Sequence, residues 1–263
     1  MQEKINKQRL VLLMVLTIIT VGSFVLLNGT DRLQVDKEVF RKLDLKIVNE
    51  VTLNSSKHQV VLSLADSRWK VNGKYDADQQ MIDVLFATLL QVEPKRPVQS
   101  RMADSLSQQL RETGVEVTLR TTAGESQQFV VGGNDTKTQA YFATSEGDVY
   151  VMHIPGYRVY ASGVFELEEG GWRNKYVFGF NWRNFKSLET QFPNPAENFS
   201  IVMQDNRVVM AGVEADTARL NTYLDDVSLL TVDEYIEAPS ADSVKKWSPR
   251  VSILVTDIGN REF

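Results

Sequence analysis

The segment that decides the fold is DADQQMIDVLFATLLQV, residues 76–92. Its apolar residues recur every three or four positions, which is the spacing of one face of an α-helix. Asp76 or Asp78 can serve as the N-cap that accepts hydrogen bonds from the first backbone amides, and Pro94 lies just beyond the predicted end. The sequence therefore predicts an amphipathic helix that covers one face of a sheet. Its apolar face consists of Met81, Ile82, Leu85, Phe86, Leu89 and Val92.

A β-hairpin precedes this helix. Residues 47–53 and 60–64 are rich in β-branched residues and flank a polar turn, and 69–71 adds a third strand. The same order returns later in the chain. There, a hairpin over 199–211 precedes EADTARLNTYLDDVSLL, residues 214–230, which aligns with the first helical segment without a gap.

The alignment places apolar residues on apolar residues. Two ββα-type repeat units around a central meander are the α+β architecture that we infer, and one continuous α+β domain is the alternative. The matched pairs are Ile82 with Leu220, Phe86 with Leu224, Leu89 with Val227, and Val92 with Leu230.

Between the two units the sequence predicts a further helix and a sheet. The helix covers about 102–112 and ends before Gly114. Glycine-containing turns then separate four short strands, which we expect to pair in antiparallel order. These strands cover 115–120, 128–131, 139–144 and 148–154, and later strands are predicted at 185–192 and 251–255.

An uncharged apolar stretch, residues 10–27, lies close to the N-terminus. As a helix it would be about 27 Å long, close to the roughly 30 Å hydrocarbon core of a bilayer. Basic residues precede it, so the positive-inside rule places the N-terminus in the cytoplasm. A cleaved signal peptide is the competing interpretation, but no small-x-small cleavage site follows. We predict an uncleaved transmembrane signal anchor that includes Leu10, Leu13, Leu16, Ile19, Phe24 and Leu27.

These elements divide the chain into four parts. Residues 1–28 are the cytoplasmic tip and transmembrane anchor, and 29–46 are a linker. Residues 47–165 form a first α+β lobe, and 166–263 form a second.

Charge and cysteine content narrow the class of protein. The net charge is −5, and three basic residues against one acidic residue before the anchor leave −7 for the rest. No basic patch interleaves with aromatic residues, so we expect no nucleic-acid partner. The absence of cysteine excludes a lipoprotein and disulfide bonds, which favours a bacterial envelope. We therefore predict a single-pass protein of the bacterial inner membrane with most of its chain in the periplasm.

The common catalytic and nucleotide-binding motifs are absent from the sequence. Its two histidines, His58 and His153, have no partner at the spacing of a metal site or a catalytic triad. The acidic pair Asp225 and Asp226 is typical of a solvated helix end. We therefore predict a non-enzymatic protein without catalytic residues, cofactor or metal site.

Aromatic and arginine side chains are concentrated in residues 157–185. This composition is typical of binding hot spots, although strand alternation would also bury half of the aromatic residues where two lobes meet. The partner-binding candidates are Tyr157, Arg158, Trp172, Arg173, Trp182 and Arg183.

Several short motifs follow one another in a fixed order. After the Trp-x-Val strand and the Ala-Asp helix come IPGY at 154–157, WRNK at 172–175, FN at 180–181, KSLE at 186–189 and FPNP at 192–195. Over about residues 47–236 this set resembles the family called domain of unknown function 4340, and most closely its single-pass forms in Bacteroidetes-type bacteria. Arg173-Asn174 departs from the Arg-Asp that relatives often carry, so no ion pair is inferred from that motif.

The resemblance implies an envelope protein with no assigned catalytic residues. Its relatives occur beside or fused to auxiliary parts of ABC-type export or gliding-motility systems. We therefore expect a membrane-anchored periplasmic module that acts in protein–protein interaction within such an assembly. The alternative is a periplasmic binding protein for a glycan, peptide or small ligand in a cleft between the repeats. The first function requires a flat arginine and aromatic patch, and the second requires a concave site.

Overall fold

The computed structural model describes residues 2–28, 35–235 and 247–263. Helix α1 (Gln2–Asn28) contains the predicted anchor. Its apolar side chains, including Leu10, Leu13, Leu16 and Ile19, are exposed. The side chains of Phe24 and Leu27 lie outside those that the structure describes. Within the described residues, no helix combines the length and the apolar character needed to cross a membrane.

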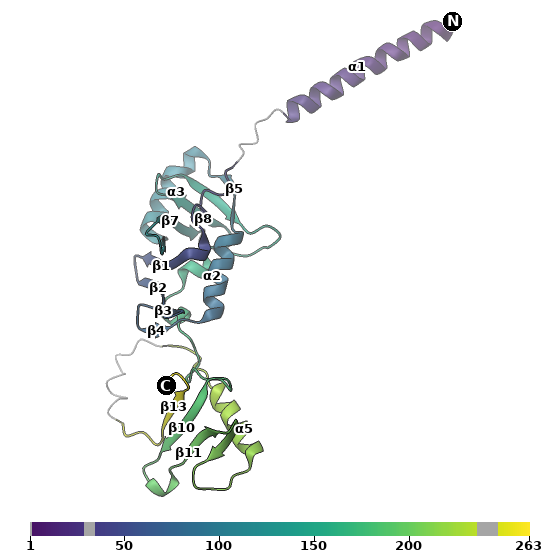
Figure 1. Cartoon of the computed structure of the whole chain (residues 1–263). Helices are drawn as coiled ribbons and strands as arrows, with labels where there is room; N and C mark the ends of the chain where they lie inside the picture. Colours follow the sequence, from purple (N-terminus) through teal and green to yellow (C-terminus); the bar gives the residue numbers. More distant parts are fainter. Residues whose placement is uncertain (1, 29–34, 236–246) are drawn as a thin grey trace.

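Nine antiparallel strands form the first sheet, with the order β4-β3-β2-β1-β6-β7-β8-β9-β5 (Figure 1). The hairpins β2–β3, β3–β4 and β11–β12 close through pairs of residues with positive φ, as type I′ turns require. The strands of the predicted meander, β6 to β9, belong to the same sheet as the first hairpin, β1–β2. The strands are β1 (Val48–Ser55), β2 (Gln59–Ala65), β3 (Arg68–Val71), β4 (Tyr75–Asp76), β5 (Glu93–Pro97), β6 (Val115–Thr121), β7 (Ser126–Gly133), β8 (Ala140–Thr144) and β9 (Val149–His153).

Strand β5 is an edge strand that the sequence pattern does not predict. It follows α2 directly and pairs with β9, and it contains Pro94 and Pro97. Proline lacks a backbone N–H and is tolerated at a sheet edge, where one side of the strand needs no donor. Because of these prolines, β5 has fewer backbone N–H groups to which a further strand could pair.

Helix α2 (Gln79–Gln91) covers one face of the first sheet. Asp78 is its N-cap, because its carboxylate accepts hydrogen bonds from the amides of Gln80 and Met81. The buried face of α2 packs into a core that contains the stacked rings of Phe129 and Phe142. This core also includes Phe40, within the predicted linker, and Trp172. The helical turns η1 (Leu45–Ile47), η2 (Gly163–Glu166) and α4 (Glu169–Trp172) lie around it.

Helix α3 (Ser100–Thr113) covers part of the opposite face. Leu110 forms a small second core with Ala143 and Val149 on β8 and β9. A Cβ atom at Gly132 would lie 2.6 Å from Cδ2 of Leu110, so any other residue there would require the Leu110 side chain to shift.

The second sheet has the order β12-β11-β10-β13 and a separate core. Helix α5 (Thr217–Ser228) packs on it through Leu220, Leu224 and Val227 (Figure 1). The strands are β10 (Phe185–Gln191), β11 (Ser200–Gln204), β12 (Arg207–Met210) and β13 (Ser252–Asp257), and η3 covers Pro195–Glu197.

The two aligned helices share their N-terminal chemistry but differ at their ends. Asp216 caps α5 through the amides of Ala218 and Arg219, as Asp78 caps α2. Val92 is buried, whereas its aligned partner Leu230 is exposed. The difference follows from what comes next: Val92 leads into β5 of the same sheet, while Leu230 leads back toward the first sheet.

Candidate functional site

One segment, residues 173–177, follows α4 directly and connects the two sheets. On one side, Arg173 forms a β-bridge with Ala77, and the amide of Asn174 donates to the carbonyl of Asp76 at 2.8 Å. On the other side, Tyr176 forms a bridge with Thr231, just beyond α5. The segment therefore connects the β4 edge of the first sheet with the chain that leaves α5.

Arg173 lies at the centre of this junction. Its guanidinium carbon lies 3.6 Å from the ring centroid of Tyr75 and 3.6 Å from that of Tyr235. The Tyr235 hydroxyl donates to the carbonyl of Asn174, which orders the second ring. Cation–π contacts on both faces hold a charged side chain of which only 21% is exposed.

Two cavities flank Arg173. The smaller, about 160 Å³, also has Tyr75, Tyr235 and Phe263 in its wall. The larger cavity has a volume of about 280 Å³ and is lined by acidic side chains, basic side chains and two glycines. Its wall consists of Glu168, Glu169, Gly170, Gly171, Arg173, Lys175, Asp233, Glu234 and Tyr235.

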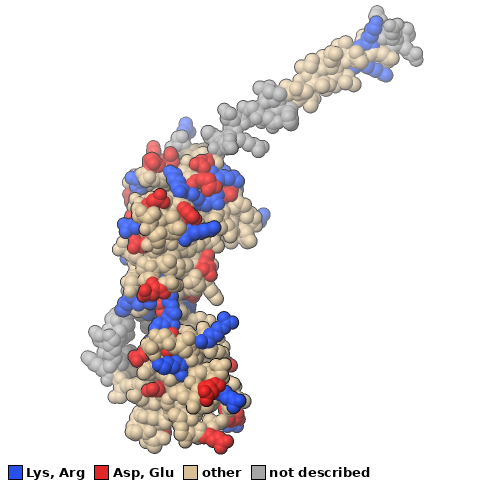
Figure 2. Space-filling view, viewed as in Figure 1, with Lys and Arg blue, Asp and Glu red and all other residues tan. Residues whose placement is uncertain are grey.

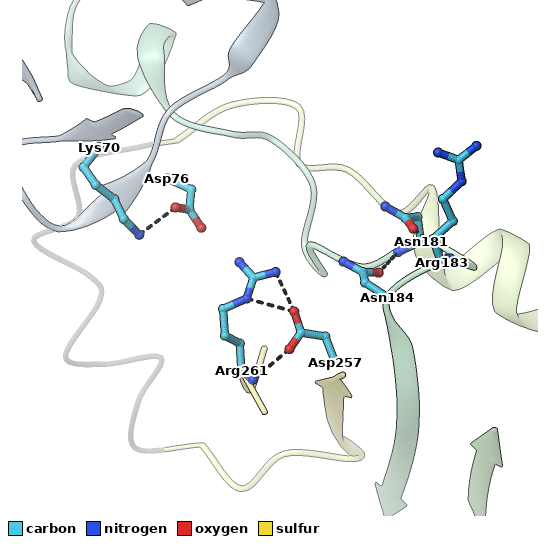
Figure 3. Close-up of polar contacts among 7 residues, drawn as sticks. All are labelled: Lys70, Asp76, Asn181, Arg183, Asn184, Asp257 and Arg261. Carbon is cyan, nitrogen blue, oxygen red and sulfur yellow. Dashed lines mark hydrogen bonds and ion pairs between the residues drawn. The ribbon is translucent and has the colours of Figure 1, made fainter. Parts of the chain in front are cut away.

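Further ion pairs lie near the junction (Figure 3). Lys70 and Asp76 pair at 2.6 Å on β3 and β4. On β13, the buried carboxylate of Asp257 accepts from Nε of Arg261 at 2.8 Å and from its Nη2 at 2.5 Å. The side chain of Arg183 points away from both pairs (Figure 3).

Trp182 lies near the C-terminal end of α5. Its indole nitrogen donates to Asp225 at 2.6 Å, and 42% of the residue is exposed. The backbone carbonyl of Asp225 accepts from the amide of Leu229, and the carbonyl of Leu230 accepts from the amide of Val177. Exposed residues therefore gather here, and we call them the Trp182 surface: Val177, Trp182, Arg183, Leu229 and Leu230.

The structure separates the other candidates from this surface. Tyr157 and Arg158 are exposed beyond β9, at the end of the first sheet. Trp172 is fully buried in the core of the first sheet and donates to the carbonyl of Leu167, so it cannot contact a partner. The alternative interpretation, burial of aromatic residues near the junction, therefore holds for Trp172 and not for Trp182.

Neither Tyr75 nor Tyr235 was predicted as a site residue. Tyr75 begins the short strand β4 and Tyr235 follows α5, and no spacing or motif in the sequence connects either residue with Arg173. Only the pairing of residues 173–177 with Ala77 and with Thr231 brings the three side chains together.

Two titratable groups near η2 have pKa values that are shifted by their neighbours. Burial, together with a hydrogen bond to Glu166, raises the pKa of Tyr160. The same Glu166 pairs with Lys137 and raises its pKa. In the described part of the chain, no group of three acidic, histidine or cysteine side chains has the geometry of a metal site. Acidic and basic residues are interspersed on the face shown in Figure 2.

Comparison with known proteins identifies a family. No curated protein and no solved structure is significantly similar to the chain. The family model described as Domain of unknown function (DUF4340) matches residues 69–247, which is more than half of the chain. This range includes the Arg173 junction and the Trp182 surface. The chain therefore belongs to the domain of unknown function 4340 family, as the motif order predicted.

Proposed function

We propose that this protein is a non-enzymatic module that binds another protein of the bacterial envelope. In this proposal, residues 10–27 anchor it in the inner membrane with the N-terminus in the cytoplasm, and both sheets lie in the periplasm. The uncharged stretch and the basic residues before it support this orientation. The partner would belong to an ABC-type transport or gliding-motility assembly.

The Trp182 surface is the observation that carries this proposal. It combines an aromatic ring, three aliphatic side chains and an arginine, and tryptophan and arginine are enriched in binding hot spots. The hydrogen bond to Asp225 fixes the indole before binding, which reduces the entropy lost in a complex. Within the described residues, the Arg183 side chain makes no ion pair. We therefore infer a partner surface with an apolar centre and a carboxylate opposite Arg183.

Crosslinking and co-purification from detergent-solubilised membranes test this surface. We expect Trp182→Ala combined with Arg183→Ala to abolish recovery of the partner. Leu229→Glu, on an exposed side chain, should do the same without touching the Trp182–Asp225 hydrogen bond. Tyr157→Ala combined with Arg158→Ala is the matched control, because it removes another exposed aromatic–arginine pair, at the first sheet. If the two variants of the Trp182 surface retain the partner and only the control loses it, the proposal is overturned.

Membrane attachment has a separate test. Alkaline extraction of membranes should leave the full chain in the pellet and release a variant that lacks residues 1–28. Release of the full chain by the same extraction would contradict the anchor without affecting the Trp182 surface.

Binding of a small ligand is the second candidate function. The larger cavity beside Arg173 favours it, because an aromatic ring and several charged groups line a concave space there.

A further inference from the structure

Arg173 differs from the other largely enclosed arginines in the described residues. Arg41 donates to the carbonyl of Leu90 at 2.5 Å and to Glu38 at 2.8 Å, and Arg261 donates twice to Asp257. The side chain of Arg173 donates no hydrogen bond to any described residue. Its nearest carboxylate, Glu169, is 3.8 Å from Nη1, and its Nε is buried without an acceptor. The Nε of Arg41 also lacks an acceptor, but both terminal nitrogens of Arg41 donate hydrogen bonds. The two rings therefore fix the guanidinium of Arg173, but none of its N–H groups donates to an acceptor among the described residues.

The stacking rings do not satisfy these donors. Tyr75 and Tyr235 occupy the two faces of the guanidinium, while its five N–H bonds lie in the plane and point outward from the edge. Leaving buried donors without a partner is costly, and more so for a charged group. An acceptor that lies in the plane, such as a carboxylate that binds two N–H groups side by side, would satisfy them.

The residues that line the larger cavity indicate which kind of ligand could supply that acceptor. Besides Arg173 and Lys175, four carboxylates line it: Glu168, Glu169, Asp233 and Glu234. A ligand with negative charge alone would be repelled by these side chains. A ligand that carries a cationic group as well would place it among them.

The volume of the larger cavity limits the size of the ligand. The cavity holds about 280 Å³, just below the range of roughly 300–1,000 Å³ that is usual for small-molecule sites. Gly170 and Gly171 line it without side chains, which leaves room along that wall. A free amino acid or the end of a short peptide fits this space, whereas an oligosaccharide does not.

We propose that this cavity binds a small zwitterion, such as a free amino acid, with its carboxylate on Arg173 and its ammonium group among Asp233, Glu234 and Glu168. This names the ligand class of the second candidate function and rests on that function, not on the Trp182 surface. Asp233 to Tyr235 follow α5 of the second sheet, whereas Glu168 and Glu169 adjoin the core of the first. Binding would therefore also hold the two sheets together.

Calorimetric titration of the full chain in detergent micelles tests the proposal. The probes are L-alanine and L-alanyl-L-alanine, with acetate and methylammonium as ligands that carry one charge only. We expect at least one zwitterion to bind and neither single-charge ligand to bind at the same concentration. Equal binding of acetate, or no binding of either zwitterion at millimolar concentration, would overturn the proposal.

Two substitutions locate the site. Arg173→Lys keeps the charge but removes the planar donors, so we expect about tenfold weaker binding. Glu234→Gln alters an exposed side chain and should weaken binding without affecting folding. Arg158→Lys is the control and should bind normally. If Glu234→Gln and Arg173→Lys, both folded by circular dichroism, bind the zwitterion like the parent chain, the site is wrong. Partner recovery through the Trp182 surface should persist in both variants, so the two proposals fail separately.

Discussion

The ring of Tyr160 lies so close to Gly133 that no side chain fits between them. A Cβ atom at Gly133 would collide with the Tyr160 ring and would lie 2.7 Å from the carbonyl oxygen of Gln139. The hydroxyl of Tyr160 also bonds to Glu166, and this side chain helps to attach the η2 turn to β7. The loop after β9 therefore depends on a glycine in the first sheet.

Gly133→Ala should accordingly destabilise the first sheet by roughly 1–3 kcal/mol, because either the ring or a backbone carbonyl must move. Chemical denaturation measures this change. Gly163→Ala is the control, since a Cβ there would contact the same ring at 3.4 Å, an ordinary van der Waals distance. Similar destabilisation by both variants would show that the close approach at Gly133 is not responsible.

Loss of the Tyr235 ring should loosen the junction rather than unfold either sheet. Tyr235→Leu removes one cation–π contact with Arg173 and the hydrogen bond to Asn174, together worth roughly 1–2 kcal/mol. Hydrogen exchange at the amide of Val232, which donates to Lys175, should become faster. Tyr176→Leu alters an exposed tyrosine of the same junction and should leave that exchange rate unchanged. Equal acceleration in both variants would argue against the stacking contact.

The ion pair of Asp257 should matter more than those at the surface. Asp257 is only 2% exposed, so Arg261→Met would leave a buried carboxylate without its charged partner. We expect a loss of about 3 kcal/mol in the second sheet, measured by thermal unfolding. Arg219→Met breaks the exposed pair with Asp216 and should cost less than about 1 kcal/mol. A small effect of Arg261→Met, similar to that of Arg219→Met, would contradict this ranking.

Acidification should release the segment that precedes β1. A hydrogen bond from Lys37 at 2.8 Å, with a smaller contribution from Arg41, lowers the pKa of Glu93 below its ordinary value of 4.5. Because the folded-state pKa is the lower one, the stabilisation is present above pH 4.5 and is lost as the pH falls through the folded pKa. Hydrogen exchange in residues 36–41 should accelerate over that range. Glu93→Gln should remove this pH dependence, and an unchanged profile would exclude Glu93 as its source.

The sequence determined the features that depend on neighbours along the chain. Helix periodicity and the caps at Asp78 and Asp216 are local, because a carboxylate bonds to amides two and three residues later. The turns are local as well, and they delimit the strands of the meander. For these reasons the α+β class, both amphipathic helices and the order of most strands were predictable from the residues alone.

Only the tertiary structure decided which segments distant in the sequence meet. β5 is a strand because β9 pairs with it, and its two prolines would argue against a strand anywhere but at an edge. Trp172 and Trp182 are similar in sequence context, yet one fills a core and the other is exposed. The same holds for Arg173, whose stacking rings come from β4 and from the chain beyond α5. Long-range pairing placed these residues, and periodicity in a single sequence carries no information about it.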